Sequence, residues 1–199
     1  MDTDRIKIRN AAYEDVEKIA NLIYYTEVFP EDVWGGESKE ECLDNLTELV
    51  KMEESRYSYR YATVAEKDGN ILGAMITIPY GRLDSLSVKT SVRVIRHIEG
   101  IAEKLRYIRD SIAFMIFREC KAGDLYIANI ATSKEARGLG VGKLLMAHAE
   151  KEAKRRKCSG ISLLAKDEKV TKFYEKLNYK KTFDMEFFGE RIIKMAKFV

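Results

Sequence analysis

The 199-residue sequence has little of several residue types on which specialised folds and sites depend. Two prolines and the absence of a Pro- or Ser-rich tract argue against disorder and against an interdomain linker. Three cysteines and two histidines lie far apart, without a C-x-x-C pair, so no metal site is expected. No stretch approaches the roughly 18 apolar residues of a membrane span, and no apolar signal segment opens the chain. A cytoplasmic protein without membrane contact is therefore predicted.

The charges nearly cancel. Lys and Arg number 35 against 32 Asp and Glu, a net charge of +3. The densest basic run, Lys151 to Lys157, alternates with Ala and Glu at the end of a predicted helix, which is typical of a solvated helix end. A nucleic-acid surface needs a coherent basic face with interleaved aromatics, so no nucleic-acid partner is predicted.

What the sequence does have is an alternation of strand and helix patterns. Arg5–Arg9 alternates like a half-buried strand, and helical spacing follows over Ala11–Val28 and after the capping residue Ser38. Tyr59–Glu66 and Ile71–Pro79 are β-rich runs joined by the hairpin pattern Lys67-Asp68-Gly69-Asn70. Further predicted elements are the strand Gly123–Ala131, the helix Leu144–Lys157, the strand Ile161–Ala165, the helix Glu168–Leu177 and the strands Tyr179–Glu186 and Arg191–Phe198.

A long helical pattern over Ser87–Phe117 interrupts this order as a helical insertion at about residues 85–120. Its apolar residues recur at about 3.4 residues per step: Val88, Val92, Ile95, Ile98, Ile101, Leu105, Ile108, Ile112 and Met115. One long helix, or two helices hinged near Gly100, would carry this stripe. The stripe either packs on the chain's own sheet, covers an acceptor groove, or pairs with its copy in a homodimer.

The segment Arg137-Gly138-Leu139-Gly140-Val141-Gly142 follows a predicted strand and precedes a helix. Alternate glycines let backbone N–H groups converge, and the helix start adds unpaired amides and a positive dipole end. The loop therefore suits a pyrophosphate, with Arg137 and Lys143 adding charge. The spacing is not that of a Rossmann loop, and Leu144 stands where a Walker loop needs Ser or Thr.

This segment matches the pattern R/Q-x-x-G-x-G/A and resembles the acetyl-CoA loop of the GNAT superfamily of N-acetyltransferases. Asn129-Ile130-Ala131 resembles the family's central strand, and Lys172–Tyr179 resembles its F-Y-E-K-L-G-F helix end. The resemblance implies an α/β fold whose central twisted sheet is mixed, mostly antiparallel and flanked by helices. It also implies one domain over residues 1–199 that transfers an acetyl group from acetyl-CoA to a primary amine of a small molecule or peptide.

The resemblance also implies residue roles. Ile130, Ala131 and Thr132 would hold the pantetheine arm. The pyrophosphate would be held by Arg137, Gly138, Leu139, Gly140, Val141, Gly142 and Lys143. Asp167 stands where an asparagine is common and is a further candidate for cofactor binding. Tyr174 matches the tyrosine that protonates the coenzyme thiolate, which a phenol does well because it is neutral at pH 7; the alternative is a core aromatic.

The general base is left open. Tyr126 stands eleven residues before Arg137, where some family members carry glutamate, and is a candidate for lining the acceptor pocket. Asp124, on the same strand face, is either a base that acts through water or a turn-capping residue. By the same resemblance, five residues border the acceptor groove, where their acidity would suit a cationic amine, or else they form a solvated loop: Glu27, Phe29, Glu31, Asp32 and Trp34. The second functional hypothesis is a CoA-binding or protein-interaction module without catalysis.

Overall fold

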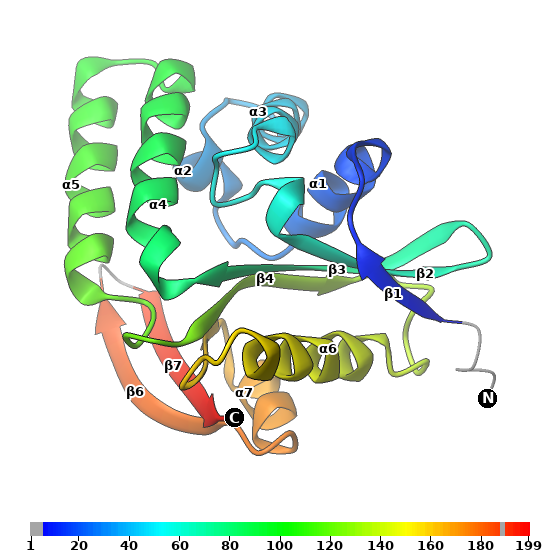
Figure 1. Cartoon of the computed structure of the whole chain (residues 1–199). Coiled ribbons are helices and arrows are strands. Elements are labelled where there is room, and N and C mark those ends of the chain that lie inside the picture. Colours follow the sequence, from blue (N-terminus) through cyan, green and yellow to red (C-terminus); the bar gives the residue numbers. More distant parts are fainter. Residues whose placement is uncertain (1–5, 188–189) are drawn as a thin grey trace.

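The computed structural model describes residues 6–187 and 190–199, and a seven-stranded sheet organises them (Figure 1). The strands are β1 (Lys7–Asn10), β2 (Ala62–Lys67), β3 (Asn70–Pro79), β4 (Leu125–Thr132), β5 (Gly160–Ala165), β6 (Lys180–Phe187) and β7 (Glu190–Phe198). Their order is β1-β2-β3-β4-β5-β7-β6, and among these described pairs only β4 and β5 run parallel. The mixed, mostly antiparallel sheet is therefore confirmed. Arg5 and Gly189 lie outside the described residues.

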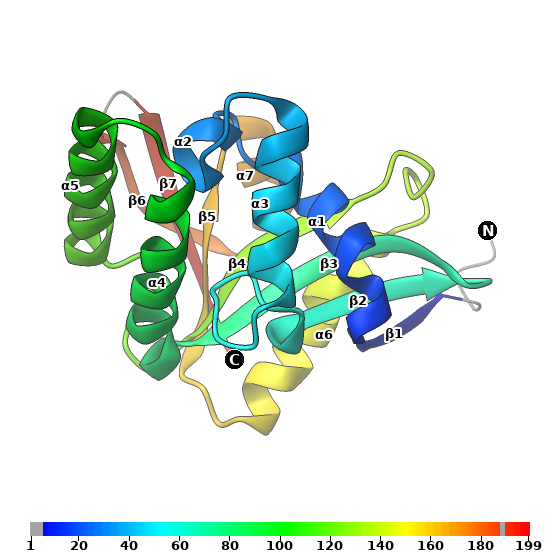
Figure 2. The same cartoon turned by 90° about the horizontal axis from the view of Figure 1, so that it is seen from above.

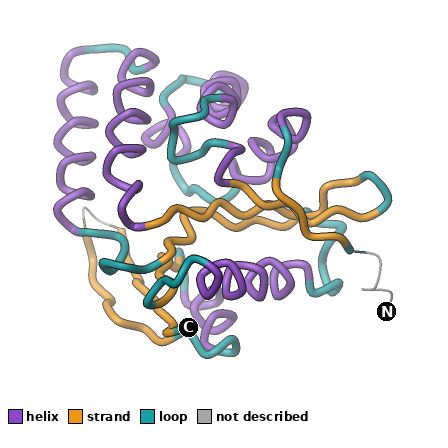
Figure 3. The backbone as a smooth tube through the Cα atoms, in the orientation of Figure 1, coloured by secondary structure: helices purple, strands orange, loops and turns teal. Residues whose placement is uncertain are grey.

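Helices cover both faces of the sheet, as Figures 1 and 2 show and as the purple segments in Figure 3 outline. They are α1 (Val16–Tyr24), α2 (Pro30–Trp34), α3 (Lys39–Lys51), α4 (Tyr80–Val94), α5 (Ile101–Phe117), α6 (Val141–Arg155) and α7 (Glu168–Glu175). Successive side chains of a strand point to opposite faces, so β3 sends Ile76 into the core under α1 and α3, and Met75 into the core over α6. Within the described residues, no helix is long and apolar enough to cross a membrane.

Turn and cap chemistry explains several element boundaries. Asp68 and Gly69 have φ values of 49° and 78°, the conformation that the β2–β3 hairpin was predicted to need. The Ser38 hydroxyl accepts a hydrogen bond from the Glu41 amide at 3.2 Å and caps α3, which is also confirmed. The start of the predicted strand Tyr59–Glu66 is wrong: its first three residues form a 3-10 turn, because the Ser58 hydroxyl accepts from the Arg60 amide.

The insertion is a helical hairpin in which α4 and α5 stand side by side beyond the end of β3 (Figure 1). It begins at Tyr80 rather than near residue 85, because Pro79 ends β3 and its φ of −62° also suits a helix start. Gly100, at φ 78°, precedes α5, so the alternative of two helices hinged near Gly100 is correct. Four residues of α4 are buried, whereas none of α5 is.

Candidate functional site

A cleft of about 1750 Å³ opens where β4 and β5 separate. The two strands pair only from Leu125 to Ile127, and beyond that point β4 stays with β3 while β5 stays with β7. The register between β3 and β4 skips Ala128, which is a bulge at the point of separation. Among the described strands, residues 128–132 of β4 have no partner on the side of the gap. Their backbone groups are thus free to pair with an extended ligand.

The predicted pantetheine residues lie on this wall of the cleft. Ile130, Ala131 and Thr132 all line it, as does Asn129, whose side-chain amide donates to the Thr26 hydroxyl at 3.1 Å. That bond ties β4 to the end of α1. The strand therefore presents fixed backbone groups to the gap.

The glycine loop winds from β4 into α6. Gly138 and Gly140 have φ values of 79° and 72°, and a Cβ at either position would meet no atom within 4 Å. Glycine is required at these two positions because φ is positive, not because a side chain would clash, and the space beside them is open for a ligand. The first amides of α6, from Val141, Gly142 and Lys143, have no acceptor in their own helix. The side chains of Leu139 and Val141 pack in the core, so these residues offer only backbone groups.

Two neighbouring glycines serve packing. A Cβ at Gly142 would lie 3.4 Å from the Phe173 ring, which brings α6 close to α7. At Gly73 of β3 it would lie 2.9 Å from the Val141 side chain, so this glycine lets the first turn of α6 approach the sheet. The sequence did not indicate this role for Gly73, because Val141 is 68 residues away in the chain.

Tyr174 reaches the cleft from α7 and is 4% exposed. Its ring packs against Phe173 and Tyr179, with centroids 5.3 and 6.0 Å away. Burial raises the pKa of the phenol, so it stays neutral and keeps its proton for donation. Tyr174 is therefore compatible with both alternatives from the sequence, because its ring packs in the core and the residue also lines the cleft.

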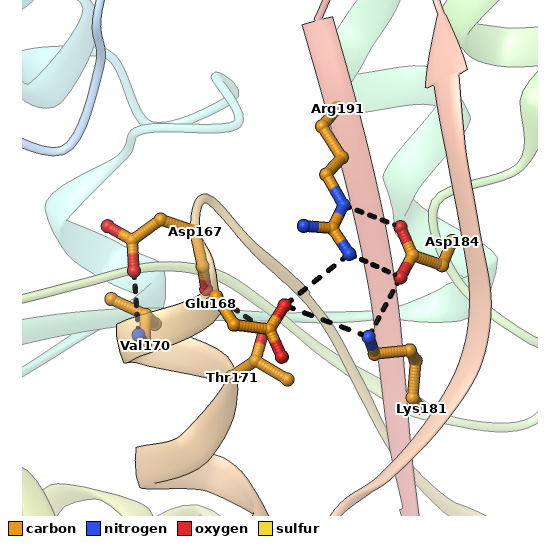
Figure 4. Close-up of polar contacts among 7 residues, drawn as sticks. All are labelled: Asp167, Glu168, Val170, Thr171, Lys181, Asp184 and Arg191. Carbon is orange, nitrogen blue, oxygen red and sulfur yellow. Dashed lines mark hydrogen bonds and ion pairs between the residues drawn. The ribbon is translucent and has the colours of Figure 1, made fainter.

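Polar contacts fix the start of α7 (Figure 4). The Asp167 carboxylate accepts from the Val170 amide at 2.7 Å, as an N-cap does. Glu168 lies 3.4 Å from Arg191, which in turn pairs with Asp184 at 2.8 Å, so the helix is tied to the β6–β7 hairpin. Asp167 is not among the residues that line the cleft, whereas Arg191 is. The carboxylate of Asp167 is engaged in its own helix.

Asp124 lies away from the cleft lining and is 4% exposed. Its carboxylate accepts a hydrogen bond from the Ser162 hydroxyl at 2.5 Å, between the starts of β4 and β5. Its carbonyl accepts from the Tyr80 amide at 3.1 Å. The placement favours a structural role for Asp124 rather than that of a base, because its side chain holds two strands together.

Tyr126 does line the cleft, in a buried polar cluster with two residues that the sequence did not single out. Burial, followed by the charge of nearby Glu119, raises the pKa of Tyr126 well above its usual range. Arg56 pairs with Glu119 at 2.8 Å. Arg56 and Glu119 are 63 residues apart in the chain, so no local sequence pattern predicts that they pair.

The far side of the cleft is walled by the α1–α2 segment and by the helical hairpin. Glu27, Phe29, Glu31 and Asp32 line it, as expected, whereas Trp34 is fully buried against Tyr24 and Tyr57. The assignment of Trp34 to the groove is therefore wrong, because the indole provides core packing under α2. Asp32 pairs with Arg106 of α5 at 3.0 Å, which links the two walls at the surface.

Comparison with known proteins bears on this geometry. The model of the acetyltransferase (GNAT) family matches residues 22–179. An N-acetyltransferase from Staphylococcus aureus Mu50 superposes with a TM-score of 0.73 at 20% identity, covering 96% of this chain and 100% of that chain. A Drosophila melanogaster polyamine N-acetyltransferase, which forms N-acetylagmatine, superposes with a TM-score of 0.64 at 12% identity, covering 98% and 100%. These likenesses are of fold. A search of curated protein sequences found no match.

Proposed function

The chain belongs to the GNAT family of acetyltransferases, and from that premise we propose that residues 1–199 form one domain that transfers an acetyl group from acetyl-CoA to a primary amine. The observation that carries the proposal is the gap between β4 and β5, bordered by the open glycine loop at one end and by Tyr174. A cytoplasmic location and the lack of a nucleic-acid partner stay predictions of the sequence.

The residues present fit acetyl-CoA. The free backbone edge of β4 at Ile130–Thr132 suits the amides of a pantetheine arm, and Gly138 to Lys143 offer amides and a helix dipole to the pyrophosphate. Arg137 lines the cleft beside them. Asp167 joins this set only through its position at the start of α7. Bound acetyl-CoA supplies the acetyl thioester.

Tyr174 acts as the proton donor in this proposal. Its raised pKa keeps the proton on oxygen at neutral pH, and burial strengthens any hydrogen bond that the hydroxyl donates. Glu27 and Glu31 on the cleft wall support a cationic acceptor, because carboxylates lower the energy of an ammonium in the cleft, whereas Asp32 is already paired with Arg106. Tyr126 is proposed to line the acceptor side, and Asp124 is set aside as a base because Ser162 holds its carboxylate.

Acetyl-CoA titration followed by an amine-panel assay for free thiol tests the function. We expect binding and thiol release with at least one primary amine. Binding without release from any amine would favour the second hypothesis, a CoA-binding module without catalysis. Absence of binding would overturn both.

A second copy of the chain is the proposed partner of α5. At about 100° per residue, the charged residues Glu103, Arg106 and Asp110 of α5, which line the cleft, lie opposite its exposed apolar residues, and Met115 lies at the border between the two faces. Ile101, Leu105, Ile108, Ile112 and Met115 follow steps of four and three, the spacing of a helix-pairing seam. With Val88, Val92 and Ile116, eight aliphatic side chains are between 38% and 80% exposed on one hairpin. A patch of this kind on a soluble protein marks an interface.

Changing Ile101 and Ile108 together to Asp should halve the mass in solution and leave acetyl-CoA binding intact. Neither side chain is buried within one copy, so the change costs folding little, whereas charges in a helix seam block pairing. Light scattering measures the mass. Phe198→Asp, at a residue that is 81% exposed on β7 and outside the seam, is the control and should keep the dimer mass. A monomeric wild type would refute the dimer.

A further inference from the structure

Glu119 is a buried carboxylate on the acceptor side of the cleft. It stands between α5 and β4, is 7% exposed, and lines the cleft together with Arg56 and Tyr126. Glutamate is almost never so deeply buried unless it is paired. Its partners therefore show what holds it there, and the cleft shows what it faces.

One side chain holds this carboxylate. Nη2 of Arg56 donates to its two oxygens at 3.2 and 2.8 Å. Arg56 is itself anchored, because its amide donates to the Thr90 hydroxyl of α4 at 2.8 Å. A carboxylate has about four acceptor positions, so these two contacts leave room for a further donor. The group is rigid, charge-balanced and incompletely bonded.

The position of Tyr126 relates Glu119 to the acetyl site. Tyr126 pairs with Ser162 in the last part of β4 that contacts β5, and the gap opens after the next residue, Ile127. Glu119 lines the same cleft as Tyr126 and lies near enough for its charge to act on the phenol. Tyr126 thus marks the end of the gap that is nearer to the acceptor wall, whereas the glycine loop that follows Thr132 lies toward the other end.

We infer that Glu119 binds the ammonium group of the acceptor and accepts its proton, an inference that rests on the proposed acetyl transfer. In this step one N–H bond of the ammonium breaks and one O–H bond forms on Glu119. The amine keeps the electron pair and becomes a neutral nucleophile. Arg56 keeps its charge, and Glu119 returns the proton to solvent through the open cleft. The fold thereby places a base that the sequence motif lacks at Tyr126.

Glu119→Gln tests the inference, because the amide keeps the size of the side chain and an acceptor oxygen for Arg56. We expect kcat/KM for the amine to fall by about 100-fold or more at neutral pH. In the variant, kcat/KM should rise by about tenfold per pH unit below the pKa of the amine, since only free amine reacts; the wild type should depend less steeply on pH. Acetyl-CoA affinity, measured by calorimetry, should stay unchanged.

Among the described residues, Arg56, Tyr126 and Cys120 are the titratable groups that interact with Glu119. Their titration does not alter the expected pH dependence of kcat/KM. Arg56 stays protonated at all assay pH values. Burial raises the pKa of Tyr126 well above its usual range and that of Cys120 to about 12, so neither changes charge near neutral pH.

Two further variants separate catalysis from structure. Glu66→Gln breaks a half-buried Glu–Arg pair outside the cleft, with Arg9 at 2.5 Å, and should leave kcat/KM and its pH profile as in the wild type. If Glu119→Gln unfolds, the double change Arg56→Gln with Glu119→Gln removes both charges and should fold with the same kinetic loss. Wild-type kinetics in either folded Glu119 variant overturns the inference alone, whereas a wild type without turnover overturns the proposed function as well.

Discussion

Gly140→Asp removes the thermal stabilisation that acetyl-CoA gives to the wild-type protein. A ligand at 100 times its Kd stabilises the folded state by about 2.7 kcal/mol, which corresponds to roughly 5–10 °C in Tm for a chain of this size. In the variant a carboxylate occupies the open space beside the amides of the loop and the start of α6, where it repels the pyrophosphate. Thermal denaturation with and without acetyl-CoA measures the difference.

Gly69→Asp is a matched control. Gly69 has a φ of 78° against 72° for Gly140, and a Cβ at either position meets open space, so both changes carry a similar backbone cost. Gly69 lies in the β2–β3 turn, away from the start of α6. We expect both variants to lose a similar amount of intrinsic stability, but only Gly140→Asp to lose the ligand shift. A full shift in Gly140→Asp would show that the loop does not hold the pyrophosphate.

We expect Tyr174→Phe to lower kcat by about 100-fold or more and to leave acetyl-CoA affinity unchanged, because only the proposed proton donor is lost. The ring contacts with Phe173 and Tyr179 are kept by phenylalanine. In the described part of the chain the hydroxyl makes no hydrogen bond to protein, so folding should be little affected. Steady-state kinetics and calorimetry measure the two quantities.

Tyr179→Phe is the control for Tyr174→Phe. Tyr179 is 2% exposed, its hydroxyl is buried without a partner, and its ring lies 6.0 Å from that of Tyr174, yet it does not line the cleft. Wild-type turnover is expected in this variant. Equal turnover in both variants would assign Tyr174 to the core alone.

The sequence by itself determined the elements and their order, because these depend on neighbours within a few residues. The alternation of apolar residues predicted the strands, Asp68-Gly69 predicted a turn with positive φ, and Ser38 predicted a helix start. The loop around Gly138 and Gly140 was equally readable, since its conformation needs glycine at those positions. The loop that is proposed to bind acetyl-CoA is local in the chain, so its conformation could be predicted.

Only the tertiary structure decided what surrounds the acceptor. Asp124 and Tyr126 share a strand face in the sequence pattern, but Ser162 engages the Asp124 carboxylate, whereas Tyr126 lines the cleft together with Glu119. Trp34 lies in an acidic loop segment and is nevertheless fully buried. The amphipathic pattern of α5 did not say which face turns inward, and the structure turns its polar face to the cleft.

The physical reason is how far apart along the chain the residues lie that determine each feature. Backbone conformation is set by sterics and hydrogen bonds within one turn, so a short segment records it. Burial and charge pairing join residues such as Arg56 and Glu119 that are brought together only when the elements pack. Periodicity encodes that a residue has a preferred face but not which partner covers it, so the acceptor side of this cleft became visible only in the folded chain.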